Sequence, residues 1–218
     1  MIDPKDINLP DFLANWYGPP VSVNQPQVGD ARLPDPLREW YGLAHRWKKI
    51  QSASHHVYDP QQIRVTGGKC EFMADSTGDW FWAFDPGGSN SVYEAELRGE
   101  WKLIPESFSV FLVHLTIVQV AASASFGRLC SQVPDELLLK ILEPMEEVGF
   151  GGWNWPRPGH RIFMSEELIA DVGPAMDFRA PWRNRSGFSS VSVSGMSSGN
   201  LDYLDCIPSV KWLRGDVG

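Results

Sequence analysis

Six carboxylates crowd the middle of the chain, and their types and spacing suggest either acid–base chemistry or a binding surface. Two carboxyls that face each other across a cleft can hydrolyse a glycosidic bond. Carboxylates on one wet face of a sheet can instead attract a basic protein, although a plain solvated sheet surface is the commoner origin of such a pattern. Only Arg98 interrupts the negative charge of this stretch. The six are Asp75, Asp79, Asp85, Glu94, Glu96 and Glu100.

Aromatic residues are interleaved with these carboxylates in the segment "DWFWAFD" at 79–85. In a strand, Trp80 and Trp82 would share one face and Phe81 would take the other. One of the two sets must then face away from the core, unless the C-terminal part of the chain covers both faces. We also expect Glu94 and Glu96 to share a solvent-exposed face. Since exposed Trp residues often anchor interfaces, the partner-binding candidates are Asp75, Asp79, Trp80, Trp82, Asp85, Glu94, Glu96 and Glu100.

Motifs for catalysis or for metal binding are weak by comparison. The sequence contains no phosphate-binding GxxxxGK[ST], no GxGxxG and no HExxH. "GMSSG" at 195–199 has the spacing of a nucleophile elbow, but it lies in a Ser-rich segment that we expect to form a hairpin rather than a strand–helix turn. His55 and His56 are adjacent, so in a strand they point to opposite faces and do not share one metal ion. We therefore predict no catalytic residue, no metal and no cofactor.

Composition narrows the class of partner. The chain of 218 residues has a formal net charge of −8, which argues against nucleic-acid binding and is compatible with a basic protein partner. Its three cysteines, Cys70, Cys130 and Cys206, are widely spaced, as expected for reduced, buried thiols in the cytoplasm. The N-terminus does not resemble a signal peptide. The apolar run 108–124 is too short to span a membrane and predicts a buried helix.

The order of the elements predicts an α+β fold with a central antiparallel sheet flanked by helices. The near-repeats "LPDFLANWYG" at 9–18 and "LPDPLREWYG" at 33–42 predict two amphipathic helices, over 9–17 and 34–46, with Asp35 either in the first turn or at the N-cap. No third copy exists, so this is not a repeat array. An antiparallel meander follows, with strands at 69–76, 79–85, 91–97 and 101–104.

The remaining segments are assigned by the same signals. A helix should begin at Pro105, and a second amphipathic helix should cover 134–150, either continuous or broken at Pro144. Residues 161–173 fit either a strand or a short helix. Alternation on both sides of "GMSSGN" predicts a late β-hairpin.

The ordered set of motifs over residues 30–120 resembles the SUKH superfamily, which includes the Smi/Knr cell-wall regulators and many bacterial immunity proteins. The family's first helix carries an LP-x-x-L pattern that ends in two aromatic residues, and its strands carry Gly, Trp and Asp-Pro at set places. Its closing helix begins with Ser or Thr and contains Phe-Leu. The matching residues here are Leu33, Pro34, Leu37, Trp40, Tyr41, Phe72, Gly78, Trp82, Asp85, Pro86, Val92, Trp101, Ser107, Phe108, Phe111 and Leu112.

This resemblance implies a non-catalytic protein that binds and neutralises a cognate toxin, here a basic toxin domain. The alternatives are a regulatory or scaffold module of the cell-wall-regulator type and a small glycan-active hydrolase. We expect a SUKH-like domain at 1–126 and a C-terminal α+β extension at 127–218 packed on the same domain. We expect a cytoplasmic protein that binds neither nucleic acid nor membrane, and the oligomeric state stays open.

Overall fold

The computed structural model describes residues 1–21, 33–47, 54–177 and 183–216. Its internal contacts divide the chain into two compact units. Pro4–Ser123 form the first, called here the N-terminal unit. Met1–Asp3 join Ala124–Gly218 in the second, the C-terminal unit. Both units combine helices with an antiparallel sheet, so the α+β class is confirmed.

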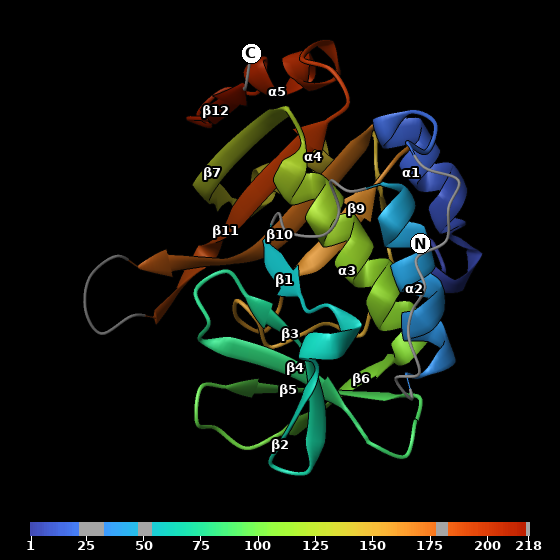
Figure 1. Ribbon diagram of the computed structural model, residues 1–218. Helices are drawn as coiled ribbons and strands as arrows, with labels where there is room; N and C mark the ends of the chain where they lie inside the picture. The colour runs from blue at the N-terminus through green and yellow to red at the C-terminus, as the bar shows by residue number, and fades with distance from the viewer. Residues whose placement is uncertain (22–32, 48–53, 178–182, 217–218) are drawn as a thin grey trace. The chain divides into compact units, whose positions relative to one another are not determined.

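Three helices of the N-terminal unit form from the segments expected to be helical, and α2 and α3 run side by side in Figure 1. The side chain of Asn8 accepts a hydrogen bond from the backbone N–H of Asp11 and caps the first helix. In the second helix Asp35 lies in the first turn, while Pro34 takes the N-cap position. The elements are η1 (Pro4–Asp6), α1 (Leu9–Tyr17), α2 (Asp35–Arg46) and α3 (Phe108–Ser123).

The expected meander forms a six-stranded sheet in the order β1-β3-β4-β5-β6, with β2 also paired to β3. Every pairing in it is antiparallel. A short helical turn, η3 (Pro60–Gln62), joins β1 to β2. The strands are β1 (His55–Val57), β2 (Arg64–Thr66), β3 (Lys69–Asp75), β4 (Trp80–Phe84), β5 (Ser91–Glu96) and β6 (Lys102–Ser107).

The start predicted for the third helix is wrong by three residues. Pro105 and Glu106 belong to β6, and α3 begins only at Phe108. Proline is tolerated there because β6 pairs only with β5 and is an edge strand. The Ser107 hydroxyl then accepts a hydrogen bond from the Val110 N–H at 3.4 Å and marks the true helix start.

The core of the N-terminal unit is aromatic where α3 meets the sheet. Phe72 of the sheet contacts Phe108 and Phe111 of the helix, and Phe84 contacts Phe108, with ring centroids 5.4–6.0 Å apart. The burial expected for this helix is confirmed, since its buried residues lie all around its circumference. None of the helices in the described part of the chain has the length and apolarity needed to cross a lipid bilayer.

The C-terminal unit is built on a second antiparallel sheet, in the order β12-β7-β11-β10-β9-β8. Its core face carries Val172, Val191 and Val193, which pack against Leu201 and Leu204. Ile2 adds an isolated parallel bridge to Val148. The elements are β7 (Phe126–Pro134), η4 (Asp135–Leu137), α4 (Leu138–Leu142), β8 (Glu146–Glu147), β9 (Arg161–Met164), β10 (Leu168–Asp177), β11 (Arg183–Gly195), η5 (Gly199–Leu201), α5 (Asp202–Asp205) and β12 (Leu213–Asp216).

Two sequence predictions for this unit are wrong. The helix expected over 134–150 is too long: α4 covers only Leu138–Leu142. It ends before Pro144, the break that the sequence left open, and Glu146–Glu147 pair with β9 instead. The hairpin expected around "GMSSGN" is absent from these described residues, since the chain turns into η5 and α5 after β11. Asn200 directs that turn: its Oδ1 accepts hydrogen bonds from the backbone N–H and the hydroxyl of Ser197. The open choice at 161–173 is resolved as strand, in β9 and β10.

The close contact between Gly173 and His160 gives a first prediction. A Cβ at Gly173 would lie 2.3–2.6 Å from three ring atoms of His160, and that ring is held by a 2.8 Å hydrogen bond to Asp171. We therefore expect Gly173→Ala to lower the free energy of unfolding by about 1–3 kcal/mol, as overpacking does. Urea unfolding measures the change.

Gly215→Ala is the matched control for this prediction, since a Cβ there meets nothing within 4 Å. Adding His160→Ala to Gly173→Ala should restore part of the lost stability, because it removes the clash. An undiminished free energy of unfolding in the single Gly173→Ala variant would contradict the prediction.

Candidate functional site

The eight partner-binding candidates differ in burial: three are buried, two are half-buried and three are exposed. Asp75, Trp82 and Glu94 are 7%, 0% and 1% exposed. Trp80 and Asp85 are half-buried. The exposed members are Asp79, Glu96 and Glu100.

Asp75 ends β3 and organises the turn into β4. Its Oδ1 accepts hydrogen bonds from the backbone N–H groups of Asp79 at 2.9 Å and Trp80 at 3.0 Å. Its Oδ2 accepts a hydrogen bond from the Thr77 hydroxyl at 2.6 Å. Gly78, with φ of 75°, supplies the left-handed residue that the turn requires. The Asp75 carboxylate therefore holds a turn, and its oxygens face the chain's own donors.

The prediction that Glu94 and Glu96 share a wet face is wrong for Glu94. Glu94 stands opposite Trp82 in the β4–β5 register, and both side chains are buried. The Trp82 ring contacts the His55 ring, with centroids 5.0 Å apart and an interplanar angle of 72°. Glu96, two residues on, closes β5 at the end of the sheet and reaches solvent. Period-two alternation assigned the two residues to one face correctly, but that face is the core face.

Asp85 is engaged in a local network at the opposite end of β4. Its carboxylate forms an ion pair with Lys69 and accepts hydrogen bonds from the hydroxyls of Ser89 and Tyr93, each at 2.9 Å. The Lys69 ammonium lies 3.7 Å from the centroid of the Tyr93 ring, as in a cation–π contact. These donors, Lys69 first, hold the pKa of Asp85 below its usual value. The network ties β3, β4 and β5 together.

The accessible candidates meet at one end of the first sheet, here called the acidic end and made of Asp79, Trp80, Glu96, Leu97 and Glu100. Trp80 stands opposite Glu96, and the Leu97 N–H donates to the Asp79 carbonyl at 2.7 Å. Leu97 is 55% exposed. Sequence reasoning missed it, although it follows directly on the alternating segment that contains Glu94 and Glu96.

A strained turn supports the acidic end. The Gly99 N–H donates to the Glu96 carbonyl at 2.8 Å and closes a turn in which Arg98 has a φ of 66°. Such a conformation costs a non-glycine residue about 1–3 kcal/mol, and strained residues of this kind cluster at functional sites. The exposed Arg98 lies in the sequence between Glu96 and Glu100.

A second feature of the N-terminal unit is an apolar groove among its three long helices. Its volume is about 370 Å³. Glu39 and Ser109 supply polar atoms to a wall that is otherwise mostly apolar. The two near-repeats place Leu9 in one helix start and Pro36 in the other, which is the signal that could have located the groove. Its main apolar residues are Ile7, Leu9, Pro36, Leu43, Leu112 and Val113.

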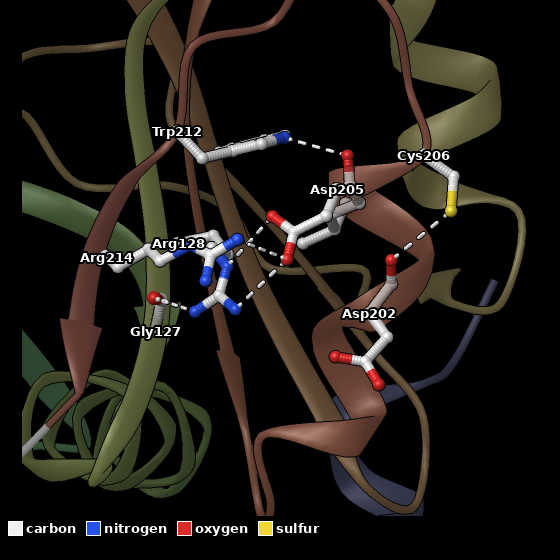
Figure 2. Close-up of polar contacts among 8 residues, drawn as sticks. Gly127, Arg128, Asp202, Asp205, Cys206, Trp212 and Arg214 are labelled. Atoms are coloured by element: carbon white, nitrogen blue, oxygen red, sulfur yellow. Dashed lines mark hydrogen bonds and ion pairs between the residues drawn. The ribbon is translucent and has the colours of Figure 1, made fainter. Parts of the chain in front are cut away.

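In the C-terminal unit the most conspicuous charged cluster has a structural role. Figure 2 shows the Asp205 carboxylate between the guanidinium groups of Arg128 and Arg214. Arg128 is buried in β7, Arg214 lies in β12, and Asp205 ends α5, so one carboxylate joins three elements. Hydrogen bonds from Arg128 are the main cause of the lowered pKa of Asp205. Trp212 adds a 3.1 Å hydrogen bond to the Leu204 carbonyl.

The residues considered for metal, thiol or nucleophile chemistry occupy ordinary structural positions. His55 is buried and His56 exposed, so their opposite orientation is confirmed. Throughout the described ranges, no group of three or more His, Cys, Asp or Glu is arranged to hold a metal ion. All three cysteines are free thiols, but Cys206 is exposed, so the expectation that all are buried is wrong. The Ser197 hydroxyl of "GMSSG" donates to Asn200 at 2.6 Å.

Comparisons with known proteins return no match to any family model, to any curated protein or to any solved structure. The resemblance to the SUKH superfamily therefore stays a prediction, and the function is argued from the molecule itself.

The different roles of Asp75 and Asp79 give a second prediction. Asp75→Ala leaves two backbone N–H groups without their acceptor and should cost about 1–3 kcal/mol in the free energy of unfolding. Asp79→Ala, in the same turn but exposed, should change it by less than about 0.5 kcal/mol. Chemical denaturation of both variants measures the difference. Equal stability of the two variants would refute the structural role of Asp75.

Buried His55 gives a third prediction, on acid stability. Burial lowers its pKa from 6.5 to about 3, with Asp75 acting in the opposite direction and His114 in the same one. The unfolded chain therefore binds a proton on His55 below pH 6.5 that the folded chain does not. Stability from this residue is present above that pH and falls by up to about 1.4 kcal/mol per pH unit toward pH 3.

His55→Gln should flatten this dependence, whereas His56→Gln, at the exposed neighbouring position, should leave it intact. Urea unfolding between pH 3 and 7 measures the slopes. Equal slopes in the two variants would show that His55 is not the titrating group.

Proposed function

We propose that this chain is a non-catalytic protein-binding domain, most specifically an immunity protein that binds and neutralises a cognate toxin with a basic domain. The observation that carries the proposal is the acidic end of the sheet. Three exposed carboxylates lie there beside the half-buried Trp80 and the exposed Leu97. The motif resemblance to SUKH proteins supports the same function.

The acidic end combines the two physical properties that such binding needs. Exposed carboxylates accelerate encounter with a positively charged partner and disfavour acidic ones. The aromatic anchor Trp80 in the same patch supplies binding energy once the surfaces dock, and Leu97 adds apolar area beside it. The hydrogen-bonded turns at Asp75–Asp79 and Glu96–Gly99 hold the patch in one conformation, which reduces the entropy lost on binding.

A regulatory or scaffold module of the cell-wall-regulator type is the second candidate, and the apolar groove is the observation that favours it. A groove of about 370 Å³ with a mostly apolar lining suits apolar side chains of a bound peptide. The glycan-active alternative has less support, because Asp75 and Asp85 are engaged by internal donors and Glu94 is buried beside Trp82. A cytoplasmic location suits the three free thiols.

A fourth prediction tests the binding function by charge reversal. The full chain, tagged and mixed with its native lysate at low and at high salt, should retain a stoichiometric partner with a basic toxin domain, more weakly at high salt. Asp79→Lys, Glu96→Lys and Glu100→Lys together should weaken the purified complex by at least about 100-fold, because attraction becomes repulsion across the interface. Calorimetry measures the affinities.

The matched control reverses three exposed carboxylates of the C-terminal unit, Glu136, Glu143 and Asp202, which changes the net charge equally. That control should bind within about threefold of the unmodified chain, and the toxin should stay inhibited. Equal losses of affinity in both triple variants would contradict a role of the acidic end in binding. Retention of a cell-wall or signalling protein instead would favour the regulatory module.

A further inference from the structure

The hairpin formed by β10 and β11 extends beyond the sheet to which it belongs. β9 pairs with β10 only over Ile169–Val172, and β7 pairs with β11 only from Phe188 onward. The outer parts of the two strands therefore pair with each other alone, as the run of these two strands past their neighbours in Figure 1 illustrates. We call Ala175–Asp177 together with Arg183–Gly187 the ribbon.

The β11 side of the ribbon is exposed, whereas Ala175 on the β10 side is buried, and specific contacts hold the ribbon in place. Five consecutive residues, Arg183 to Gly187, are exposed. An isolated two-stranded ribbon is only marginally stable in water. Here the Arg185 guanidinium lies 4.0 Å from the centroid of the Phe188 ring and donates to the side chain of Gln132 in β7. Gln132 in turn donates to the Met176 carbonyl at 3.2 Å, so both ribbon strands are tied to the sheet.

A large bulge determines which side chains the ribbon presents. Pro174 stands opposite Ser189, but Met176 stands opposite Asn184, so one residue of β10 faces four residues of β11, Arg185–Phe188. Gly187, with φ of 77°, provides the left-handed conformation that the excess chain needs. Bulges of this kind redirect side chains and are found next to functional sites. This one presents Arg185 above Phe188.

The charge of the ribbon is opposite to that of the chain as a whole. The net charge of the protein is −8, but the ribbon carries two exposed arginines, Arg183 and Arg185. Within the described residues neither forms an ion pair, although Arg183 stands opposite Asp177 across the strands. Guanidinium groups bind carboxylates through paired hydrogen bonds. Two such groups on a projecting ribbon suit a surface that presents carboxylates.

We propose that the ribbon is a second interaction surface, which docks through Arg183 and Arg185 onto a carboxylate-bearing surface of a protein partner. A protein is favoured over a nucleic acid because Arg183 and Arg185 form a small local cluster on an acidic chain, whereas nucleic-acid binding uses a long basic stripe. Two arginines are enough to pair with neighbouring carboxylates. The inference does not rest on the acidic end, which belongs to the N-terminal unit.

The fifth prediction uses two fluorescent probes, a ten-residue oligoglutamate and a ten-nucleotide single-stranded DNA. Fluorescence anisotropy with the full chain at low salt should detect oligoglutamate binding and weaker DNA binding. Arg183→Ala combined with Arg185→Ala should reduce affinity for oligoglutamate by at least about tenfold, since each lost charge-assisted contact costs about that factor. Arg183→Ala alone removes no ion pair among the described residues. If the double variant does not fold, this single variant should still show reduced affinity for oligoglutamate.

Lys140→Ala with Lys211→Ala is the matched control, because both lysines are exposed in the same unit and the charge change is identical. The control should keep its affinity within about twofold. The proposal is overturned if oligoglutamate fails to bind, if the ribbon and control variants bind it equally, or if DNA binds more tightly through the same two arginines.

Discussion

The N-terminal unit depends on α3, a helix that is buried on all sides and nevertheless carries polar residues. Each of these must find a partner, since an unsatisfied buried polar group costs about 1–3 kcal/mol, about twice what one hydrogen bond contributes. Thr116 accepts from the Trp40 indole of α2 at 2.9 Å, and Gln119 donates to the His55 carbonyl of β1 at 2.8 Å. His114 is 2.9 Å from Glu106 of β6. The buried polar groups of α3 thereby fix the positions of a helix and two strands.

This arrangement decides which residues of the sheet can meet a partner. The sheet face that carries Phe72 and Trp82 packs in the core, and Glu94 is buried on the same face. Asp75 and Asp85 lie at opposite ends of β3 and β4, where each is used to stabilise a turn or a strand junction. What remains for recognition is the acidic end, whose conformation is determined by the same hydrogen-bonded turns. Asp75 and Asp85 therefore stabilise the fold, while the neighbouring exposed residues of the acidic end are left for the proposed binding.

The two units offer surfaces of opposite charge. The acidic end in one unit presents carboxylates with an aromatic and an aliphatic neighbour. The ribbon in the other presents two arginines, of which Arg185 is held by the Phe188 ring and the Gln132 amide. Both surfaces are built on backbone irregularities, a left-handed Arg98 in the first and a four-residue bulge in the second. Such irregularities cost free energy in the folded chain. Each of the two lies at a surface that we propose to bind a partner.

Local patterns in the sequence determined the α+β class, the first two helices, the strands of the meander and the buried character of the segment after it. These features depend on periodicity and on turn residues, which act over a few positions. Burial depth could not be obtained in this way: Glu94 and Glu96 alternate alike, and only the packing of α3 buries one of them. The helix start at Phe108 also depended on tertiary structure, because the edge position of β6 tolerates Pro105 in a strand. The turn after Gly195 depended on the core of the C-terminal unit, which accepts Leu201 and Leu204. The ribbon could not be predicted from sequence patterns, because its extent depends on where the pairing of β10 with β9 and of β11 with β7 ends.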